Sequence, residues 1–323
     1  MSATDRDNPK ILVMGEALVD VVSRSGDDID EHVGGSPANV AFGLGRLGHH
    51  VALATWIGSD RRGKRIARTC RRAGVQLVPG SDKAPKTSVA NADIDAEGHA
   101  TYHFDLTWVL PTLPHIRDVD HVHTGSIGAT LEPGGTQVVA ALKATGGDVT
   151  ISYDPNARPT LMGDPRDARK RVEEIVVLSD VVKASDEDIE WFYPERAIDD
   201  VVADWLAMGP SLVVVTRGSK GATFAIRGAE PVLAPSADVE KVDTVGAGDS
   251  FMAGLLSGLL DAGLLGGEGA RVKLGQAAPV DVLPAVQRAV ATSGVTVSRG
   301  GAYAPTRKEL ESLAGQLAAA VEC

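Results

Sequence analysis

Short runs rich in β-branched residues alternate with helical stretches along most of this 323-residue chain. The predicted strands lie at 11–13, 51–54, 119–124, 149–153, 181–183 and 212–216. The predicted helices lie at 38–47, 62–73, 136–143, 167–178, 198–208, 249–260 and 282–290. Because strand–helix–strand repetition pairs successive strands in parallel and leaves helices on both faces, the sequence predicts a three-layer α/β/α fold with a mostly parallel central sheet.

Residues 87–110 break this alternation. Polar and apolar residues take turns from Ser88 to Asp95 and again from Thr101 to Asp105, and Glu97-Gly98 between them is typical of a turn. A period of two on either side of a turn predicts a β-hairpin.

The composition is that of a globular protein, with 43% hydrophobic and 23% charged residues. The net charge of −11 argues against nucleic acid and membrane partners. Cys70 and Cys323 are the only cysteines, so we expect no disulfide framework and a reducing, cytoplasmic setting. The first ten residues are polar, which argues against a signal peptide. The most apolar run, 251–265, is too short to cross a bilayer and predicts a buried helix.

Gly246-Ala247-Gly248-Asp249 stands directly before that apolar run. A turn of small residues at a helix start directs backbone N–H groups at one point, where the helix dipole also favours negative charge. Asp249 beside such an anion hole is placed to accept the proton of a hydroxyl that attacks a phosphoryl group. The alternative is a helix N-terminus with an aspartate near its cap, which the tetrapeptide alone suits equally well.

A second glycine-rich segment begins at Gly34-Gly35. Ser36 is predicted as the N-cap of a helix and the following proline as its first residue. Asn39 falls in the first turn, from which its amide would point back toward the two glycines. Gly43 and Gly45 further along cost about 1 kcal/mol each relative to alanine, and we expect close packing against a neighbouring strand to compensate.

Three other patterns carry less information. The glycines from Gly58 to Gly63 fit the P-loop spacing until Arg65, where a serine or threonine should bind Mg²⁺. His115, His121 and His123 cluster in the sequence, and His121-x-His123 on a strand could bind a metal. No carboxylate or third histidine stands at a suitable spacing, so we expect a surface or strand-end role. The basic run within 61–72 predicts a solvated helix face.

The two glycine-rich segments, Gly34-Gly35 to Asn39 and Gly246 to Asp249, together resemble the PfkB (ribokinase-like) family of carbohydrate kinases. Further motifs of the resemblance are Val13-Met14-Gly15-Glu16 to Asp20, Ile57-Gly58-Ser59-Asp60, Asp154-Pro155-Asn156-Ala157-Arg158-Pro159, and Thr216-Arg217-Gly218 with Gly221. The motifs follow in family order over nearly the whole chain. The resemblance implies a single ribokinase-like kinase domain over residues 1–323, with a small β-sheet lid from about 15–35 and 87–110. The Asp154 element and Lys183-x-Ser185 most resemble the fructokinase-type branch.

The resemblance also implies an acceptor site beneath the lid. Its residues are Asp20, Gly35, Asn39, Phe104 and Arg158, with Trp108 as an alternative to Phe104. A carboxylate such as Asp20 suits a pair of neighbouring sugar hydroxyls. Simpler roles stay open: Asp20 as a surface carboxylate, the aromatic residues as packing within the hairpin, and Arg158 in an ion pair with Asp154 or Asp164.

ATP is implied along the C-terminal half. The nucleotide contacts are Lys183, Ser185, Thr216, Arg217, Gly218, Gly221, Gly246 and Gly248, with Gly246, Ala247 and Gly248 as the anion hole and Asp249 as the base. The family's Asn-x-x-Glu element, which organises Mg²⁺, corresponds here to Ser185-Asp186-Glu187-Asp188, so Asp188 is the first candidate ligand and Glu187 the second. The resemblance further implies a monovalent cation, K⁺, near backbone oxygens of Asp243, Val245, Thr296, Arg299 and Gly301.

The implied activity is Mg²⁺- and ATP-dependent transfer of the γ-phosphoryl group to a hydroxymethyl group of a small sugar, with fructose as the first choice. Ribose, 2-keto-3-deoxygluconate and a nucleoside remain alternatives, although 4% aromatic residues offer little for stacking a base. A non-catalytic sugar or nucleotide sensor would not need the intact Gly-Ala-Gly-Asp. A Rossmann-type oxidoreductase would need a Gly-x-Gly-x-x-Gly after a strand. A lid would exclude water from ATP, and its unpaired edges predict a homodimer through the lid.

Overall fold

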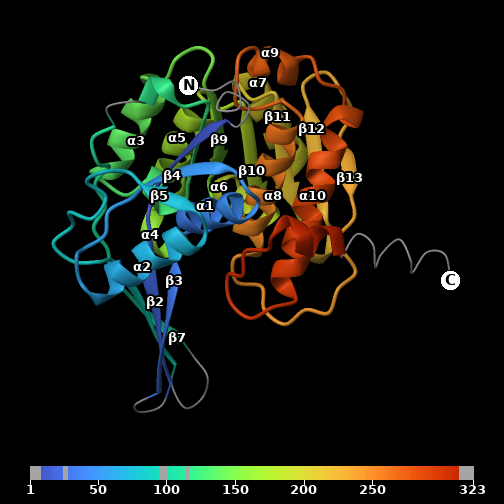
Figure 1. Cartoon of the computed structure of the whole chain (residues 1–323). Helices are drawn as coiled ribbons and strands as arrows, with labels where there is room; N and C mark the ends of the chain where they lie inside the picture. Colours follow the sequence, from blue (N-terminus) through green and yellow to red (C-terminus); the bar gives the residue numbers. More distant parts are fainter. Residues whose placement is uncertain (1–8, 25–27, 95–99, 114–115, 313–323) are drawn as a thin grey trace.

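A nine-stranded sheet runs through the centre of the computed structural model, which describes residues 9–24, 28–94, 100–113 and 116–312 (Figure 1). In spatial order its strands are β13 (Val232–Ala234), β12 (Ala222–Ile226), β11 (Leu212–Thr216), β10 (Val181–Ser185), β9 (Thr150–Asp154), β8 (His121–Gly125), β1 (Lys10–Met14), β4 (His50–Ala54) and β5 (Val75–Leu77). All neighbours from β11 to β5 pair in parallel, whereas β12 pairs antiparallel with β11 and β13. The predicted mostly parallel sheet is confirmed.

Apolar side chains cover both faces of this sheet. In β1, Ile11 and Val13 belong to one buried core, while Leu12 and Met14 belong to the other. This division follows because successive side chains of a strand point to opposite faces. The first core lies under α1 (Ser36–Arg46), α2 (Arg61–Arg72), α8 (Ala247–Asp261), α9 (Ala270–Gly275) and α10 (Pro279–Val297). The second lies under α3 (Gly134–Lys143), α5 (Pro165–Val176), α6 (Asp186–Phe192) and α7 (Ile198–Met208), beside the short α4 (Pro159–Met162).

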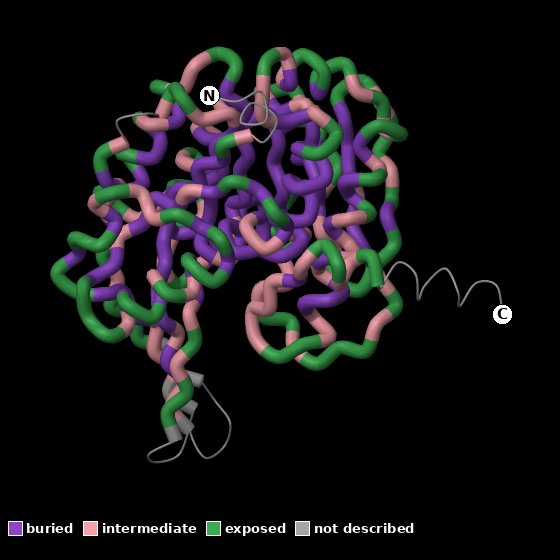
Figure 2. Tube along the Cα trace, viewed as in Figure 1, coloured by how far each residue is buried: buried purple, intermediate pink, exposed green. Residues whose placement is uncertain are grey.

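The two cores confirm the three-layer α/β/α architecture. Figure 2 shows them as the buried centre of the molecule, with exposed backbone at its rim. Three single turns, η2 (Ile116–Asp118), η3 (Ser126–Ala129) and η4 (Gly218–Lys220), connect the larger elements.

Four strands form a second, smaller sheet that projects from the body (Figure 1). In spatial order they are β3 (Asp28–Gly34), β2 (Leu18–Arg24), β6 (Val89–Ile94) and β7 (Ala100–Asp105). β6 and β7 pair antiparallel, which confirms the predicted hairpin, while its turn at Glu97-Gly98 lies outside the described residues. β2 pairs antiparallel with β3 and in parallel with β6, so it joins the two segments expected to form the lid. We call this four-stranded sheet the lid.

Helix α8 is the centre of the first core. Its residues from Asp249 to Leu260 are all buried, as predicted for the most apolar run. A Cβ on Gly43 of α1 would lie 2.5 Å from the Cβ of Ala253, so this glycine lets α1 approach a helix and not a strand. A Cβ on Gly45 would lie 3.0 Å from Cγ2 of Val75 in β5, so Gly45 does pack against a strand, as expected. Among the described residues, no helix has both the length and the apolar character needed to cross a membrane.

Two other expectations about local structure are wrong. Gly35, with φ +102, is the N-cap of α1 and makes no side-chain capping bond, and Ser36 is already the first helical residue. The surface role expected for the paired histidines of β8 is wrong, because His121 is 0% and His123 is 1% exposed, although His121 does stand at the end of its strand, as the alternative had it. They bond to hydroxyl groups of the neighbouring β9, and burial lowers the pKa of both rings to about 3. His115 lies outside the described residues.

Candidate active site

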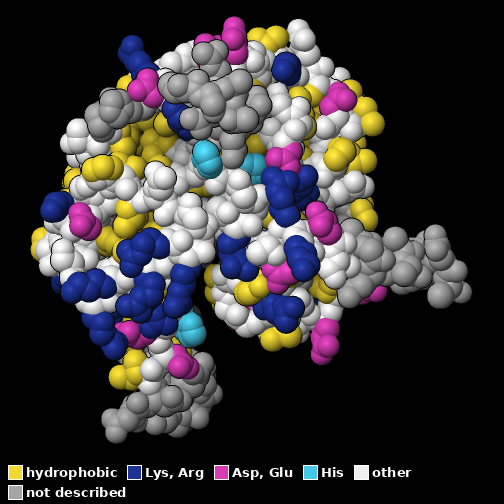
Figure 3. Space-filling model, in the orientation of Figure 1, with side chains coloured by type: hydrophobic (Ala, Val, Ile, Leu, Met, Phe, Trp, Pro, Cys, Tyr) yellow, Lys and Arg dark blue, Asp and Glu magenta, His cyan; other side chains and the backbone are white. Residues whose placement is uncertain are grey.

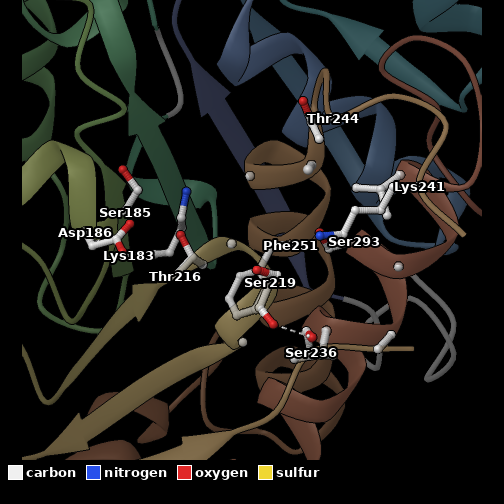
Figure 4. A pocket seen from close by; sticks show the side chains of 18 of the residues that line it. Lys183, Ser185, Asp186, Thr216, Ser219, Ser236, Lys241, Thr244, Phe251 and Ser293 are labelled. Atoms are coloured by element: carbon white, nitrogen blue, oxygen red, sulfur yellow. Dashed lines mark hydrogen bonds between the residues drawn. The ribbon is translucent and has the colours of Figure 1, made fainter. Parts of the chain in front are cut away.

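A pocket of about 310 Å³ opens where β10 and β11 end beside the start of α8. Figure 4 shows Lys183, Ser185 and Thr216 on one side of it and Lys241 and Ser293 on the other. The pocket therefore lies at the carboxyl ends of parallel strands, which is where open α/β sheets bind their ligands.

The start of α8 forms one wall of this pocket. Gly246 is its N-cap with φ +74, and no side chain caps the helix. A Cβ on Gly246 would lie 2.6 Å from the Cβ of Ala302. Glycine is therefore required both by the left-handed conformation and by the close approach of the loop that carries Ala302. Ala247 and Gly248 follow as lining residues. An uncapped helix start of small residues has the geometry that an anion hole needs.

Asp249 lies in the first turn of α8 and is 7% exposed. Ser36 Oγ donates to its Oδ1 at 2.7 Å, Asn39 Nδ2 to its Oδ2 at 2.8 Å, and Asn156 Nδ2 to its Oδ1 at 3.2 Å. Asn39 therefore contacts this carboxylate, and not the glycine loop toward which we expected it to point. The sequence analysis missed Ser36 and Asn156 as partners of the base, although both stand inside motifs that it used.

Asp20 lies on β2 of the lid, close to this carboxylate. A Cβ on Gly34 of the neighbouring strand would lie 2.1 Å from Asp20 Oδ2, so the glycine makes room for the carboxylate. Burial raises the pKa of Asp20, the charge of Asp249 adds to the effect, and His32 and Arg158 oppose it. Arg158 and Asp249 thus lie near enough to Asp20 to act on the pKa of its carboxylate, so these three predicted residues lie in one region.

Gly35 serves the backbone around it. A Cβ on Gly35 would lie 2.5 Å from the carbonyl oxygen of Glu16 and 3.0 Å from Ala17 Cα. Its φ of +102 also disfavours any other residue. Glycine is therefore required at this position by the close contact with the segment between β1 and β2, whether or not a sugar binds beside it.

Glu16 is a buried acidic residue beside the site that was not predicted from the sequence. It is 7% exposed, and its carboxylate accepts the N–H of Ser36 at 3.2 Å and that of Gly128 at 2.8 Å. Burial raises the pKa of Glu16 to about 7, against the lowering effect of hydrogen bonds from its own backbone, from Gly128 and from the Ser126 side chain, and of the charge of Arg158. Glu16 thus joins the start of α1 to η3 and changes its charge near neutral pH. Its place after a strand was visible in the sequence, but its burial was not.

Arg158 is exposed beside the pocket. Its Nη1 donates to the Asn156 carbonyl at 3.1 Å, to Asn156 Oδ1 at 2.7 Å and to the Ala157 carbonyl at 2.9 Å. The ion pairs considered as alternatives are absent from this part of the structure, because Asp154 pairs with Lys183 and Asp164 with Arg166.

Lys183 and Asp154 form a buried ion pair at the base of the pocket. Lys183 Nζ lies 2.8 Å from Asp154 Oδ2, and the side chains are 3% and 0% exposed. Burial alone would lower the pKa of Lys183, but the carboxylates of Asp154, Asp188 and Asp249 raise it above its usual value. A Cβ on Gly248 would lie 3.2 Å from Nζ, so the ammonium group reaches the start of α8. A positive charge here can neutralise a phosphate group.

The other predicted nucleotide contacts divide into two sets. Ser185, Thr216, Gly218 and Gly221 line the pocket. A Cβ on Gly221, which has φ +89, would lie 2.2 Å from the carbonyl oxygen of Ala234. Arg217 is not among the lining residues, and its side chain lies 3.5 Å from Asp199. In this structure the Arg217 side chain thus contacts Asp199, and its contact with the phosphates stays a prediction.

The two aromatic candidates differ in their surroundings. Trp108 is 2% exposed and donates from Nε1 to the carbonyl of Gly128 at 2.7 Å, so it belongs to the second core. Phe104 lies on β7 of the lid and is 37% exposed.

Asp188 has a structural task in addition to any metal. Its Oδ1 accepts the N–H of Ala157 at 2.7 Å and its Oδ2 that of Ser185 at 2.8 Å, which completes the capping box of α6. Together with Asp186 and Glu187 it lines the pocket. Mg²⁺ in kinases is bound through one or two carboxylates together with substrate phosphates, so this acidic wall fits an ion that enters with the nucleotide. Within the described part of the chain, no three His, Cys, Asp or Glu residues are clustered for a metal.

The segments expected around a monovalent cation lie side by side. Asp243 accepts the N–H of Val245 at 3.0 Å and that of Gly301 at 2.8 Å, so its carboxylate joins the two loops. Thr296 Oγ1 donates to the carbonyl of Tyr303 at 2.8 Å, within the same region. Cation binding by the carbonyl oxygens stays a prediction.

Fold and site together are those of an enzyme that moves a phosphoryl group to a sugar. The model of the pfkB family of carbohydrate kinases matches residues 8–309. The chain therefore belongs to this family, and it is an ATP-dependent carbohydrate kinase.

Individual relatives narrow the branch. A fructokinase of Klebsiella pneumoniae is 34% identical over 271 residues, which cover 80% of this chain and 86% of that protein. The crystal structure of a fructokinase from Vibrio cholerae O395 with fructose, ADP and calcium ion bound has a TM-score of 0.76 at 26% identity and covers 95% of this chain and 99% of its own. The structure of a fructokinase from Xylella fastidiosa with bound ATP, at 24% identity, shares the fold with a TM-score of 0.80 and covers 96% of this chain and 99% of its own. The resemblance to the fructokinase-type branch is confirmed.

Proposed function

We propose that this protein is a fructokinase, which transfers the γ-phosphoryl group of ATP to a hydroxymethyl group of fructose. One observation carries the proposal: the buried Asp249 stands at a helix start without a side-chain cap, where a Cβ on the adjacent Gly248 would lie 3.2 Å from the ammonium group of Lys183. Three side chains of the described residues hold its carboxylate by hydrogen bonds. The fructokinase relatives support fructose as the acceptor.

The acceptor is held between the lid and the main sheet. Asp20 accepts hydrogen bonds from neighbouring sugar hydroxyls, and Phe104 packs against the sugar from the lid. Asn39 keeps the Asp249 carboxylate in place while its amide oxygen is available to a sugar hydroxyl. Arg158 Nη1 keeps its contacts with the adjacent loop, and the other donors of the guanidinium group reach the sugar or the transferred phosphate. Asp249 accepts the proton of the attacking hydroxyl.

The nucleotide occupies the pocket of about 310 Å³. Ser185, Thr216, Gly218 and Gly221 contact it along the strand ends, and Arg217 contributes through its backbone. Lys183 and the N–H groups of the Gly246–Gly248 turn stabilise the charge that develops on the γ-phosphoryl oxygens.

The finer features of the site are part of the same proposal. The residues present fit Mg²⁺ beside Asp188, where it would neutralise phosphate charge when bound. K⁺ would bind near Asp243 and Gly301. The outer strands of the lid, β3 and β7, carry exposed Ile29 (59%) and Phe104 (37%), so two lids can pair in a homodimer. We place the enzyme in the cytoplasm.

The test is a panel of acceptors with ATP and Mg²⁺, read by ADP release. The panel contains fructose, glucose, ribose, 2-keto-3-deoxygluconate and adenosine, and Asp249→Asn is the control for contaminating kinases. We expect kcat/KM for fructose to exceed that for every other acceptor by about tenfold or more. A higher value for another acceptor would replace fructose, and binding of sugar without ADP release would indicate a sensor.

A further inference from the structure

The two oxygens of the Asp249 carboxylate differ in how much of their hydrogen-bonding capacity the protein uses. A carboxylate has about four acceptor sites, two on each oxygen. Oδ1 accepts hydrogen bonds from Ser36 Oγ at 2.7 Å and Asn156 Nδ2 at 3.2 Å. Oδ2 accepts one hydrogen bond from the described residues, from Asn39 Nδ2 at 2.8 Å. The protein therefore fills Oδ1 and leaves an acceptor site on Oδ2.

The amide of Asn156 fits these partners in a single orientation. Arg158 Nη1 donates to its Oδ1 at 2.7 Å. A guanidinium group has donors only, so a reversed amide would place two donors against each other. The NH₂ group is thereby directed at Ser36 Oγ, 2.7 Å away, and at Asp249.

The loop that carries Asn156 is held in place by its neighbours. Asn156 has φ +38, a conformation that residues other than glycine seldom adopt and that asparagine tolerates better than most. The next residue, Ala157, donates its N–H to Asp188 Oδ1 at 2.7 Å. Backbone in such a conformation persists where the surroundings fix it, and it concentrates at functional sites.

We propose that Asn156 is a positioning residue for phosphoryl transfer, which together with Ser36 fills Oδ1 of Asp249 so that Oδ2 accepts the proton of the sugar hydroxyl. This inference rests on the proposed kinase reaction and extends it to a residue and an atom that the reaction alone does not specify.

The atoms of the step balance as follows. The hydroxyl oxygen of the sugar forms a bond to the γ-phosphorus, while the bond from that phosphorus to the bridging oxygen breaks and its electron pair leaves with ADP. The hydroxyl proton goes to Oδ2 of Asp249 and is released to water after the product departs. A carboxylate free to rotate would present Oδ2 correctly only part of the time, and a misplacement of about 1 Å costs on the order of 10²-fold in rate.

Three substitutions separate the amide from the backbone. Asn156→Gly removes the amide and relieves the left-handed conformation, whereas Asn156→Ala removes the amide and retains the strain. We expect both to lower kcat by about 10- to 100-fold with KM values for fructose and ATP within about threefold of the parent. Ser36→Ala, which removes the other donor to Oδ1, should resemble them.

Asn156→Asp keeps the shape of the side chain but places a second carboxylate beside Asp249. Lys183 and Arg158 are the cations near this pair. The other nearby carboxylates are Asp20 and Asp154, Glu16, which accepts the N–H of Ser36, and Asp188, which accepts the N–H of Ala157. Like charges at this separation resist joint ionisation, so the acidic limb of kcat against pH should move to higher pH by about one unit or more.

A second measurement needs no turnover. Asn156→Asp should lower the melting temperature at pH 8, and most of that loss should disappear when Asp249→Asn is added, because only one carboxylate then remains. Asn156→Gly should melt close to the parent, which shows that its loss of rate is not a loss of fold.

The outcomes are distinct. Asn156→Gly with a kcat within twofold of an active parent and an unchanged pH profile would overturn the proposal. Equal destabilisation by Asn156→Asp with and without Asp249→Asn would also overturn it. A parent that phosphorylates no acceptor would refute the proposed function instead, and the melting experiment would then decide whether Asn156 holds Asp249.

Discussion

The two sheets of this molecule differ in how far apolar packing holds them. The nine-stranded sheet lies between two apolar cores. The lid adds Val19 and Val21 of β2 and Val89 of β6 to the first core, and polar groups also fasten it. Glu31 of β3 lies 2.7 Å from Arg61 and 2.9 Å from Arg62 of α2, and Asp60 accepts the N–H and the hydroxyl of Thr87, each at 2.8 Å, just before β6. Figure 3 shows the basic side chains gathered over α2, where the lid leaves the body.

This difference in packing distinguishes the nucleotide side of the site from the acceptor side. Burial of apolar surface stabilises a framework strongly, whereas an ion pair at the surface contributes about 0–1 kcal/mol and is weakened by salt. Asp249 and Lys183 belong to the framework, and Asp20 belongs to the lid. We therefore expect the nucleotide side to be preformed and the acceptor side to depend on a part that can adjust. A kinase benefits from such a division because water must be kept from ATP until the acceptor is bound.

The largest expected effect is on the framework side. Asp249→Asn should lower kcat by about 10²- to 10⁴-fold, because the hydroxyl loses its proton acceptor. The affinity for ATP, measured by calorimetry, should stay within about threefold of the parent. Asp164→Asn is the matched control, since Asp164 also stands at a helix start but outside the pocket. A rate within tenfold of the parent would remove Asp249 from the role of base.

The next effect concerns Glu16, which lies between β1 and β2 where the two sheets meet. Burial raises its pKa from 4.5 to about 7, so the folded protein holds this proton more tightly than the unfolded chain. Stability from this group is complete below about pH 4.5 and is lost as the pH rises through about 7. Glu16→Gln cannot ionise. Between pH 5 and pH 8 its free energy of unfolding should therefore gain about 2.5 kcal/mol relative to the parent.

Urea unfolding at the two pH values measures this difference. Glu190→Gln is the control, because Glu190 is exposed on α6. If the Glu16→Gln variant and the parent change in parallel with pH, Glu16 does not titrate in this range.

A smaller effect is expected on the lid side of the site. Asp20→Ala should weaken fructose binding by about 1–3 kcal/mol, because sugar hydroxyls lose their acceptor, and ATP binding without sugar should not change. Asn39→Ala should differ from it by lowering kcat as well, since Asn39 also holds Asp249. Calorimetry with each ligand alone gives the answer. Equal losses for fructose and ATP would show that the two sides of the site are not separate.

The smallest effect tests the fastening of the lid itself. Glu31→Gln should speed hydrogen exchange of β3 and β6 by an amount corresponding to less than about 1 kcal/mol, and added salt should do the same to the parent. The strands β10 and β11 should not change. Glu174→Gln, which removes an ion pair with Lys143 on the body, is the control. Faster exchange in β10 and β11 as well would mean that the lid and the framework unfold as one unit.

The sequence predicted the framework well because its pattern is local. β11 and α7 were predicted to the residue, since their apolar periodicity depends only on neighbours in the chain. The role predicted for Ser36 at the start of α1 was wrong: it bonds to Asp249, 213 positions away, instead of capping its own helix. Which partner a serine takes at such a distance is decided by tertiary packing.

Charged and polar residues in buried places were the other limit. Glu16 follows a strand as a surface residue might, and its burial arises only when α1 and η3 close over it. His121 and His123 have polar partners on β9, and no pattern within β8 reveals those partners. The motifs in the sequence identified the candidate residues of the site. They could not show which of those residues bond to the carboxylate of Asp249.

Phosphorus NMR of ATP, Mg²⁺ and fructose with the enzyme measures the central claim most directly, because it distinguishes transfer to a sugar from hydrolysis. We predict that a sugar phosphomonoester grows as the γ-phosphate signal of ATP disappears, and that the Asp249→Asn variant gives neither change on the same timescale. Inorganic phosphate released at the same rate with and without fructose, and no sugar phosphate, would contradict the account.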